Sequence, residues 1–131
     1  MLASVPLLVI PLILFNLGLG AFSDLDPWQQ PLLSFVMVQG NLFTLDRGTA
    51  LVVLALVLLF FELLKSTRTS NASVLDHLLS IFVFVAFLLE FLLVPAAGQG
   101  MFLVLTVIAL VDVLAGFTVS LRAAGRDVHF G

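Results

Sequence analysis

The sequence predicts an all-α integral membrane protein whose four transmembrane helices form a compact antiparallel bundle. Of its 131 residues, 62% are apolar and 10% are charged, and the mean hydropathy is +1.27. Soluble domains contain about 45–50% apolar and about 25% charged residues. Four stretches also approach the roughly 20 apolar residues with which a helix crosses a bilayer. These observations exclude a water-soluble globular domain.

The predicted spans make up one transmembrane domain, and they cover residues 2–21, 48–65, 74–94 and 101–122. Pro6 and Pro11 fall in the first span, where membrane helices tolerate proline. This segment lacks the basic residues that begin a signal peptide, so we expect it to be retained as a span. The short connections after the second and third spans predict antiparallel neighbours.

The longest connection, residues 22–47, is predicted to lie on the outer face as a surface helix or a re-entrant segment. Its central part, from Trp28 to Leu45, is apolar but contains several glutamine and asparagine side chains. Buried amides need hydrogen-bond partners that lipid does not provide, so we expect this part not to cross the membrane. Trp28, the only tryptophan, is expected at the membrane–water interface.

Basic residues set the predicted orientation. Lys65 and Arg68 lie at the linker of residues 66–73, and Arg122 and Arg126 follow the last span. Loops rich in lysine and arginine face the cytoplasm, which places the linker and both chain termini on that side. The uncharged turn at residues 95–100 then lies outside.

The rest of the composition removes several classes of function. The chain has no cysteine and two histidines, which argues against disulfides, thiolate metal sites, zinc and heme. Its net charge is −3 without a run of like charges, so we expect no nucleic-acid partner. No serine has a histidine and an acid at a spacing typical of hydrolases. We therefore expect no enzyme, no cofactor and no metal.

Two ionisable groups near span ends have simple structural interpretations. Ser73 and Asp76 match the S-x-x-D pattern of a capping box at the start of the third span. Glu62 lies three residues before Lys65, and this pair is expected to reach water at the membrane surface. His77, next to Asp76, is expected at the same interface.

Two deeper carboxyl groups are candidate functional sites. Asp112 lies at the centre of the fourth span, where a charge costs about 2.5–3.5 kcal/mol, so it must face protein or a wet cavity. Glu90 lies nearer the outer end, and we expect it to form a polar layer with Asn16 and Thr106. The stripe that contains Asp112 also holds small residues suited to close helix packing. These residues are Ala109, Gly116 and Ser120.

The segments LLEFLLVPAAG (Leu88–Gly98) and DVLAGFTVSLRAAGRDV (Asp112–Val128) resemble small, uncharacterised four-span proteins of the bacterial inner membrane. The resemblance covers the last two spans and the tail, about a third of the chain. It implies a bacterial inner-membrane location and a four-helix layout, and it implies no activity for any residue.

The sequence favours an accessory or assembly subunit of a larger membrane protein complex, and an energy-transducing assembly is one suitable host. No extramembrane domain is predicted, and the apolar faces exceed what four helices bury among themselves. The alternative is a small proton- or cation-coupled transporter or channel that is oligomeric and uses Asp112 and Glu90. A homo-oligomer is open in either case, and the lipid bilayer is the remaining expected partner.

Overall fold

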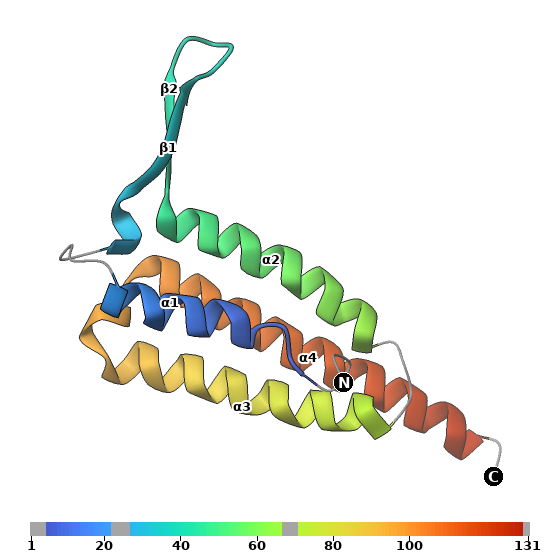
Figure 1. The fold of residues 1–131 in the computed structure, drawn as a ribbon. Coiled ribbons are helices and arrows are strands. Elements are labelled where there is room, and N and C mark those ends of the chain that lie inside the picture. Colours follow the sequence, from blue (N-terminus) through green and yellow to red (C-terminus); the bar gives the residue numbers. More distant parts are fainter. Residues whose placement is uncertain (1–4, 22–26, 67–70, 130–131) are drawn as a thin grey trace.

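The computed structural model of the chain describes residues 5–21, 27–66 and 71–129. Four helices lie side by side, and a two-stranded hairpin projects from one end (Figure 1). In chain order the elements are α1 (Val9–Ala21), the 3₁₀ turn η2 (Pro27–Gln29), β1 (Pro31–Val36), β2 (Leu42–Asp46), α2 (Arg47–Ser66), α3 (Asn71–Leu93), the 3₁₀ turn η3 (Pro95–Ala97) and α4 (Gly100–His129).

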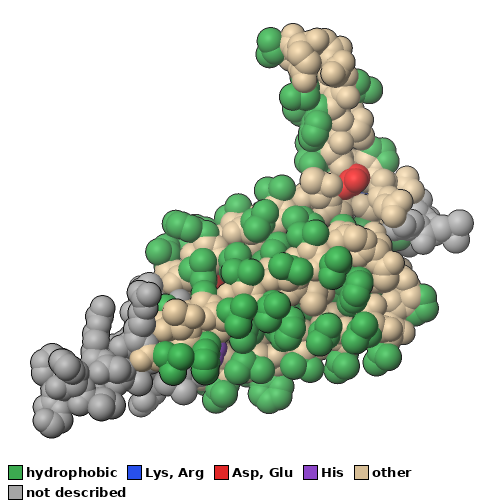
Figure 2. Space-filling view, turned by 180° about the vertical axis from the view of Figure 1, so that it is seen from behind, with side chains coloured by type: hydrophobic (Ala, Val, Ile, Leu, Met, Phe, Trp, Pro, Cys, Tyr) green, Lys and Arg blue, Asp and Glu red, His purple; other side chains and the backbone are tan. Residues whose placement is uncertain are grey.

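Three helices, α2, α3 and α4, are long and apolar enough to cross a membrane. Hydrophobic side chains cover the visible face of the bundle and of the hairpin, and an acidic side chain shows where the two meet (Figure 2). The predicted helical architecture of membrane type is therefore confirmed in its coarse form. The small β-hairpin was not predicted.

Helix α4 is the centre of the bundle, with α2 and α3 packed along it and α1 lying in front of it (Figure 1). Phe15 of α1, Phe87 of α3 and Phe102 of α4 are fully buried and form the aromatic core. The ring centroids of Phe15 and Phe102 are 4.6 Å apart, and those of Phe87 and Phe102 are 5.5 Å apart. One aromatic group therefore joins three helices.

Trp28, which was predicted to lie at the membrane–water interface, extends this core. Its side chain is buried, stacks on Phe15 at 5.6 Å, and donates its indole N–H to the carbonyl oxygen of Phe15 at 3.2 Å. A Cβ atom at Gly18 would clash with the indole ring. The small residue on α1 therefore makes room for Trp28 to close the hairpin end of the bundle.

The helix predicted at residues 2–21 is shorter in the structure, because α1 begins at Val9 and has 13 residues. Residues 1–4 lie outside the described part. The residues after Pro6 form a turn before the helix starts. Proline has no N–H to donate, and Pro11 falls in the first turn of α1, where an N–H would have no helical partner. The two prolines thus set where α1 begins.

The segment predicted as a surface helix or re-entrant loop is an antiparallel hairpin. Its strands pair Ser34 with Thr44 and Phe35 with Phe43. The turn between them contains Gly40 at φ 96°, a backbone conformation that glycine adopts at little cost. Gln39 and Asn41, two of the amides that argued against a membrane crossing, lie on either side of Gly40 in this turn.

The ends of the long helices also differ from the prediction. Helix α2 continues to Ser66 and α3 begins at Asn71, so the linker is shorter than residues 66–73. Helix α4 has 30 residues and projects beyond α2 and α3 (Figure 1). Its last turns contain the basic tail that was expected after the fourth span.

Candidate ionisable site between the helices

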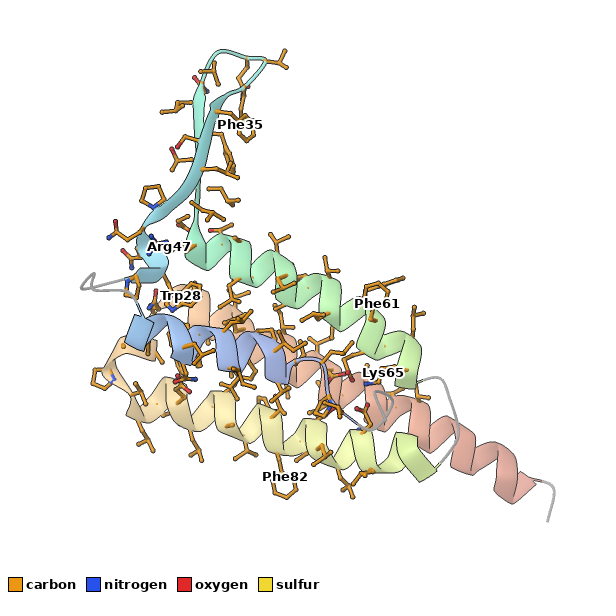
Figure 3. All side chains as sticks on the ribbon, viewed as in Figure 1. Trp28, Phe35, Arg47, Phe61, Lys65 and Phe82 are labelled. Carbon is orange, nitrogen blue, oxygen red and sulfur yellow. The ribbon has the colours of Figure 1, made fainter. Side chains whose placement is uncertain are left out.

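The candidate site begins at the end of α2, where Glu62 and Lys65 form the predicted pair. Lys65 Nζ lies 3.0 Å from Glu62 Oε1, one helical turn away. Glu62 is only 1% exposed, so the prediction that it reaches water is wrong. Lys65 points into the bundle, whereas the apolar Phe61 and Phe82 point away from it (Figure 3). The ion pair thus belongs to the interior.

Asp76 of α3 joins the same lysine. Its Oδ1 atom lies 3.3 Å from Lys65 Nζ, and the residue is buried. The predicted capping box of Ser73 and Asp76 is wrong, because α3 begins at Asn71 and Ser73 is already inside the helix. The side chain of Ser73 lies outside the described part. Asp76 is therefore a partner of α2 and not the cap of its own helix.

Asp112 of α4 completes the site. It is 5% exposed, as expected for a carboxyl too deep to reach water. Its side chain is hydrogen-bonded to that of Ser80, a buried residue one turn after Asp76 on α3, and it lies within the electrostatic reach of Glu62, Asp76 and Lys65. We call Glu62, Lys65, Asp76, Ser80 and Asp112 the ionisable cluster.

The cluster also holds the segment that leads into α1. The backbone N–H of Leu7 donates to Glu62 Oε1, and Lys65 Nζ donates to the carbonyl oxygen of Val5 at 2.6 Å. Both backbone groups precede α1, and at the start of a helix N–H groups such as that of Leu7 lack a helical acceptor. Glu62 and Lys65 therefore satisfy two backbone polar groups ahead of α1, and they join this segment to α2.

The cluster has more acidic than basic groups. Its described side chains comprise three carboxyl groups and one ammonium group. Within the described residues, no group of three histidine, cysteine or acidic side chains is arranged to hold a metal ion. Chemically, such a site can bind a proton, which reduces the charge that has to be buried.

The second candidate carboxyl, Glu90, does not join Asp112. Asn16 Nδ2 donates to Glu90 Oε1 at 3.0 Å, so the structure brings together two of the three residues of the predicted polar layer. The third, Thr106, is buried and donates to the carbonyl oxygen of Phe102 in its own helix at 3.0 Å. Glu90 Oε2 is buried and has no hydrogen-bond partner among the described residues.

The predicted packing stripe of α4 faces α3. Ala109 and Gly116 are buried. A Cβ atom at Gly116 would lie 2.6 Å from Nδ1 of His77, and the His77 ring stacks near Phe117 at 6.5 Å. His77 therefore packs against α4. The side chain of Ser120 lies outside the described part of the structure.

Sequence reasoning missed Ser80 and the burial of Glu62. One signal was available, because Asp76, Ser80, Val83 and Phe87 recur at helical spacing and share the buried face of α3. Glu62 carries a similar signal, because Leu51, Ala55, Leu58 and Glu62 recur at helical spacing and are buried or partly buried on α2.

The fold and the cluster define a small protein of apolar helices that encloses an ionisable site. Compared with known proteins, this chain matches no family model, no curated protein and no solved structure. Its function has to be inferred from the site.

Proposed function

We propose that this chain is a small proton- or cation-coupled transporter or channel in which the ionisable cluster takes up and releases a proton. The observation that carries the proposal is the burial of Glu62, Asp76 and Asp112 around a single lysine, within helices that are otherwise apolar. Ionisable residues inside membrane helices are costly and mark proton relays and ion pathways.

Charge balance favours this function over a purely structural one. With every carboxyl ionised, the described cluster would carry three negative charges and one positive charge. An unpaired charge in a low-dielectric interior is strongly disfavoured, and a protonated carboxyl removes it. Asp112 is the natural place for the exchangeable proton, because Lys65 pairs directly with the other two acids and not with Asp112.

Glu90 and Asn16 form a second polar station toward the other end of the bundle. Glu90 lies ten residues after Ser80 on α3, which corresponds to about 15 Å along the helix axis. Buried apolar side chains, including Val83 and Phe87, lie between them on the same helix. Proton transfer between the stations therefore requires water to enter this apolar layer.

The proposed setting is the bacterial inner membrane. In this proposal the chain has four antiparallel spans, with α1 and its preceding turn as the first, and both termini lie in the cytoplasm and the hairpin outside. Lys65 and the basic tail of α4 support this orientation through the positive-inside rule.

Proton flux into vesicles tests the proposal. The purified chain is reconstituted with a pH-sensitive dye inside, and a potassium diffusion potential drives proton entry. We expect flux from the unmodified protein and at least a tenfold loss in Asp112→Asn, which keeps the size and hydrogen bonding of the side chain. Asp46→Asn is the matched control, because Asp46 caps α2 through Thr49 N–H outside the cluster. Absence of flux, or full flux in Asp112→Asn, contradicts the proposal.

A second candidate is an accessory or assembly subunit of a larger membrane complex. The specific observation in its favour is the last part of α4, which projects beyond the other helices (Figure 1). Gentle extraction of a tagged chain, followed by size analysis and mass spectrometry, tests this candidate. Stoichiometric recovery with one large complex, lost when α4 is truncated after Leu121, is the expected result. Recovery as a monomer or a small homo-oligomer excludes it.

A further inference from the structure

The hairpin exposes apolar side chains on both of its faces. Leu33, Phe35, Phe43 and Leu45 lie on one face, where the Phe35 and Phe43 rings are 5.4 Å apart. The other face carries Val36 and Leu42, which are 70% and 66% exposed. No residue from Pro31 to Leu45 is charged. A surface of this kind is disfavoured in water, because exposed apolar patches are normally covered.

The bundle does not cover the hairpin. Strands β1 and β2 meet the helices only at their base, and the hairpin projects across the helix axes instead of continuing along them (Figure 1). An isolated two-stranded hairpin is marginally stable in water. Its surroundings must therefore contribute to its stability.

The polar groups of the hairpin show which surroundings suit it. Ser34 Oγ donates to Thr44 Oγ1 at 3.1 Å, so these two hydroxyls satisfy each other. Each strand has only one neighbour, which leaves an unpaired backbone edge on both sides. Such edges do not occur in the hydrocarbon core, where no water pairs with them. They are satisfied at the boundary between headgroups and acyl chains, where water is present.

The position of the hairpin matches that boundary. Strand β2 ends at Asp46, and α2 begins at Arg47, where the first long apolar helix starts. These two charged residues stand at the base, with Asp46 bonded to Thr49 N–H and Arg47 bonded to the carbonyl oxygen of Pro27. A hairpin that leaves this point across the helix axes runs parallel to the membrane surface.

We propose that the hairpin lies in the lipid–water boundary of the bilayer, with lipid on both faces. The occupant of its apolar surface is the lipid itself and not a partner protein. A partner protein would cover one face or one edge, whereas apolar side chains occur on both faces and at the turn. Because the hairpin is uncharged, its binding requires no anionic lipid. This inference does not depend on the proposed function of the cluster.

Depth-dependent fluorescence quenching tests the inference, and the absence of native cysteine makes single labels unambiguous. Leu33→Cys and Val36→Cys place a polarity-sensitive label on opposite faces. Val57→Cys, on the exposed side of the middle of α2, is the deep reference. Each variant is reconstituted in phosphatidylcholine vesicles that contain nitroxide lipids labelled at shallow or deep positions. Iodide is the aqueous quencher.

We expect both hairpin labels to be quenched at least twofold more by shallow than by deep nitroxides, and only weakly by iodide. The label at residue 57 should show the reverse depth preference. Adding phosphatidylglycerol should not change the hairpin values. Strong iodide quenching of both labels would place the hairpin in water and overturn the inference. Protection of one face from both quenchers would also overturn it, and copper-catalysed crosslinking would then show whether a second copy covers that face.

Discussion

At one end of the bundle, acidic and basic side chains are buried among apolar helices, whereas at the other end an uncharged hairpin exposes its leucine, valine and phenylalanine side chains. A protein in water shows the opposite distribution: its apolar side chains are mostly buried and its charged side chains are mostly exposed. A buried charge persists when it is paired, protonated and hydrogen-bonded. An exposed apolar hairpin is stable when its environment is apolar.

The comparison shows that the two ends are stabilised in different ways. The cluster is stabilised by specific ion pairs and hydrogen bonds, so removing one charged group should lower the free energy of unfolding strongly. The hairpin depends on its surroundings and contributes little to the bundle. Substitutions at the two ends should therefore differ in how much they destabilise the bundle.

The largest loss of stability is expected for Lys65→Met. Without the ammonium group, Glu62 and Asp76 lose their common partner, and the carbonyl oxygen of Val5 loses its donor. Breaking a buried ion pair costs about 3–5 kcal/mol of the free energy of unfolding. Reversible denaturation in mixed micelles measures the loss. Lys65→Arg keeps the charge and should lose less, and equal stability of Lys65→Met and the unmodified chain would contradict the pairing.

A smaller loss of stability is expected at the hairpin end of the bundle, where Gly18 packs against Trp28. Gly18→Ala forces a methyl group into the ring of Trp28, and overpacking of this kind costs about 1–3 kcal/mol. Gly20→Ala is the matched control, because no atom lies within 4 Å of its added Cβ. We expect the control to stabilise α1 by up to about 1 kcal/mol. The same denaturation assay compares both, and equal effects would show that Trp28 does not pack as described.

The pair formed by Asn16 and Glu90 should contribute less still. Interhelical side-chain hydrogen bonds in membrane proteins average about 0.6 kcal/mol in double-mutant cycles. A cycle of Asn16→Ala and Glu90→Gln should give a coupling energy of about this size. A coupling of zero would show that the 3.0 Å contact carries no stability.

The smallest effect on the bundle is expected for Gly40→Ala. The positive φ at this position costs a residue with a Cβ about 1–2 kcal/mol, which should weaken the hairpin turn. Hydrogen exchange of the backbone amides in residues 31–46 should become faster, while the thermal midpoint of the bundle stays unchanged. A lower midpoint would show that the hairpin and the bundle unfold together.

Hydropathy predicted the long helices well, because composition alone determines whether a segment of about 20 residues suits a bilayer. The hairpin was not predicted, since its apolar residues were interpreted as a surface helix or a re-entrant segment and its amides as evidence against a membrane crossing. Gly40 between Gln39 and Asn41 was the local signal for a turn. Turn chemistry, and not hydropathy, separates a hairpin from a surface helix here.

The candidate site was predicted only in part. The depth of Asp112 and the pairing of Glu62 with Lys65 follow from positions along single helices. The convergence of Glu62, Asp76 and Asp112 does not, because it depends on the rotation of α2 and α3 against α4. The segment before α1 adds a further tertiary effect, since Glu62 and Lys65 bond to the backbone groups of Leu7 and Val5.

Proton exchange by the ionisable cluster can be measured by infrared difference spectroscopy of the reconstituted protein as the pH is changed. A carboxyl group that gains a proton inside the bundle gives a C=O band distinct from that of an ionised carboxylate. We predict a pH-dependent C=O band from the cluster that disappears in Asp112→Asn and persists in Asp46→Asn. An identical difference spectrum in all three proteins would show that Asp112 exchanges no proton and would contradict the account.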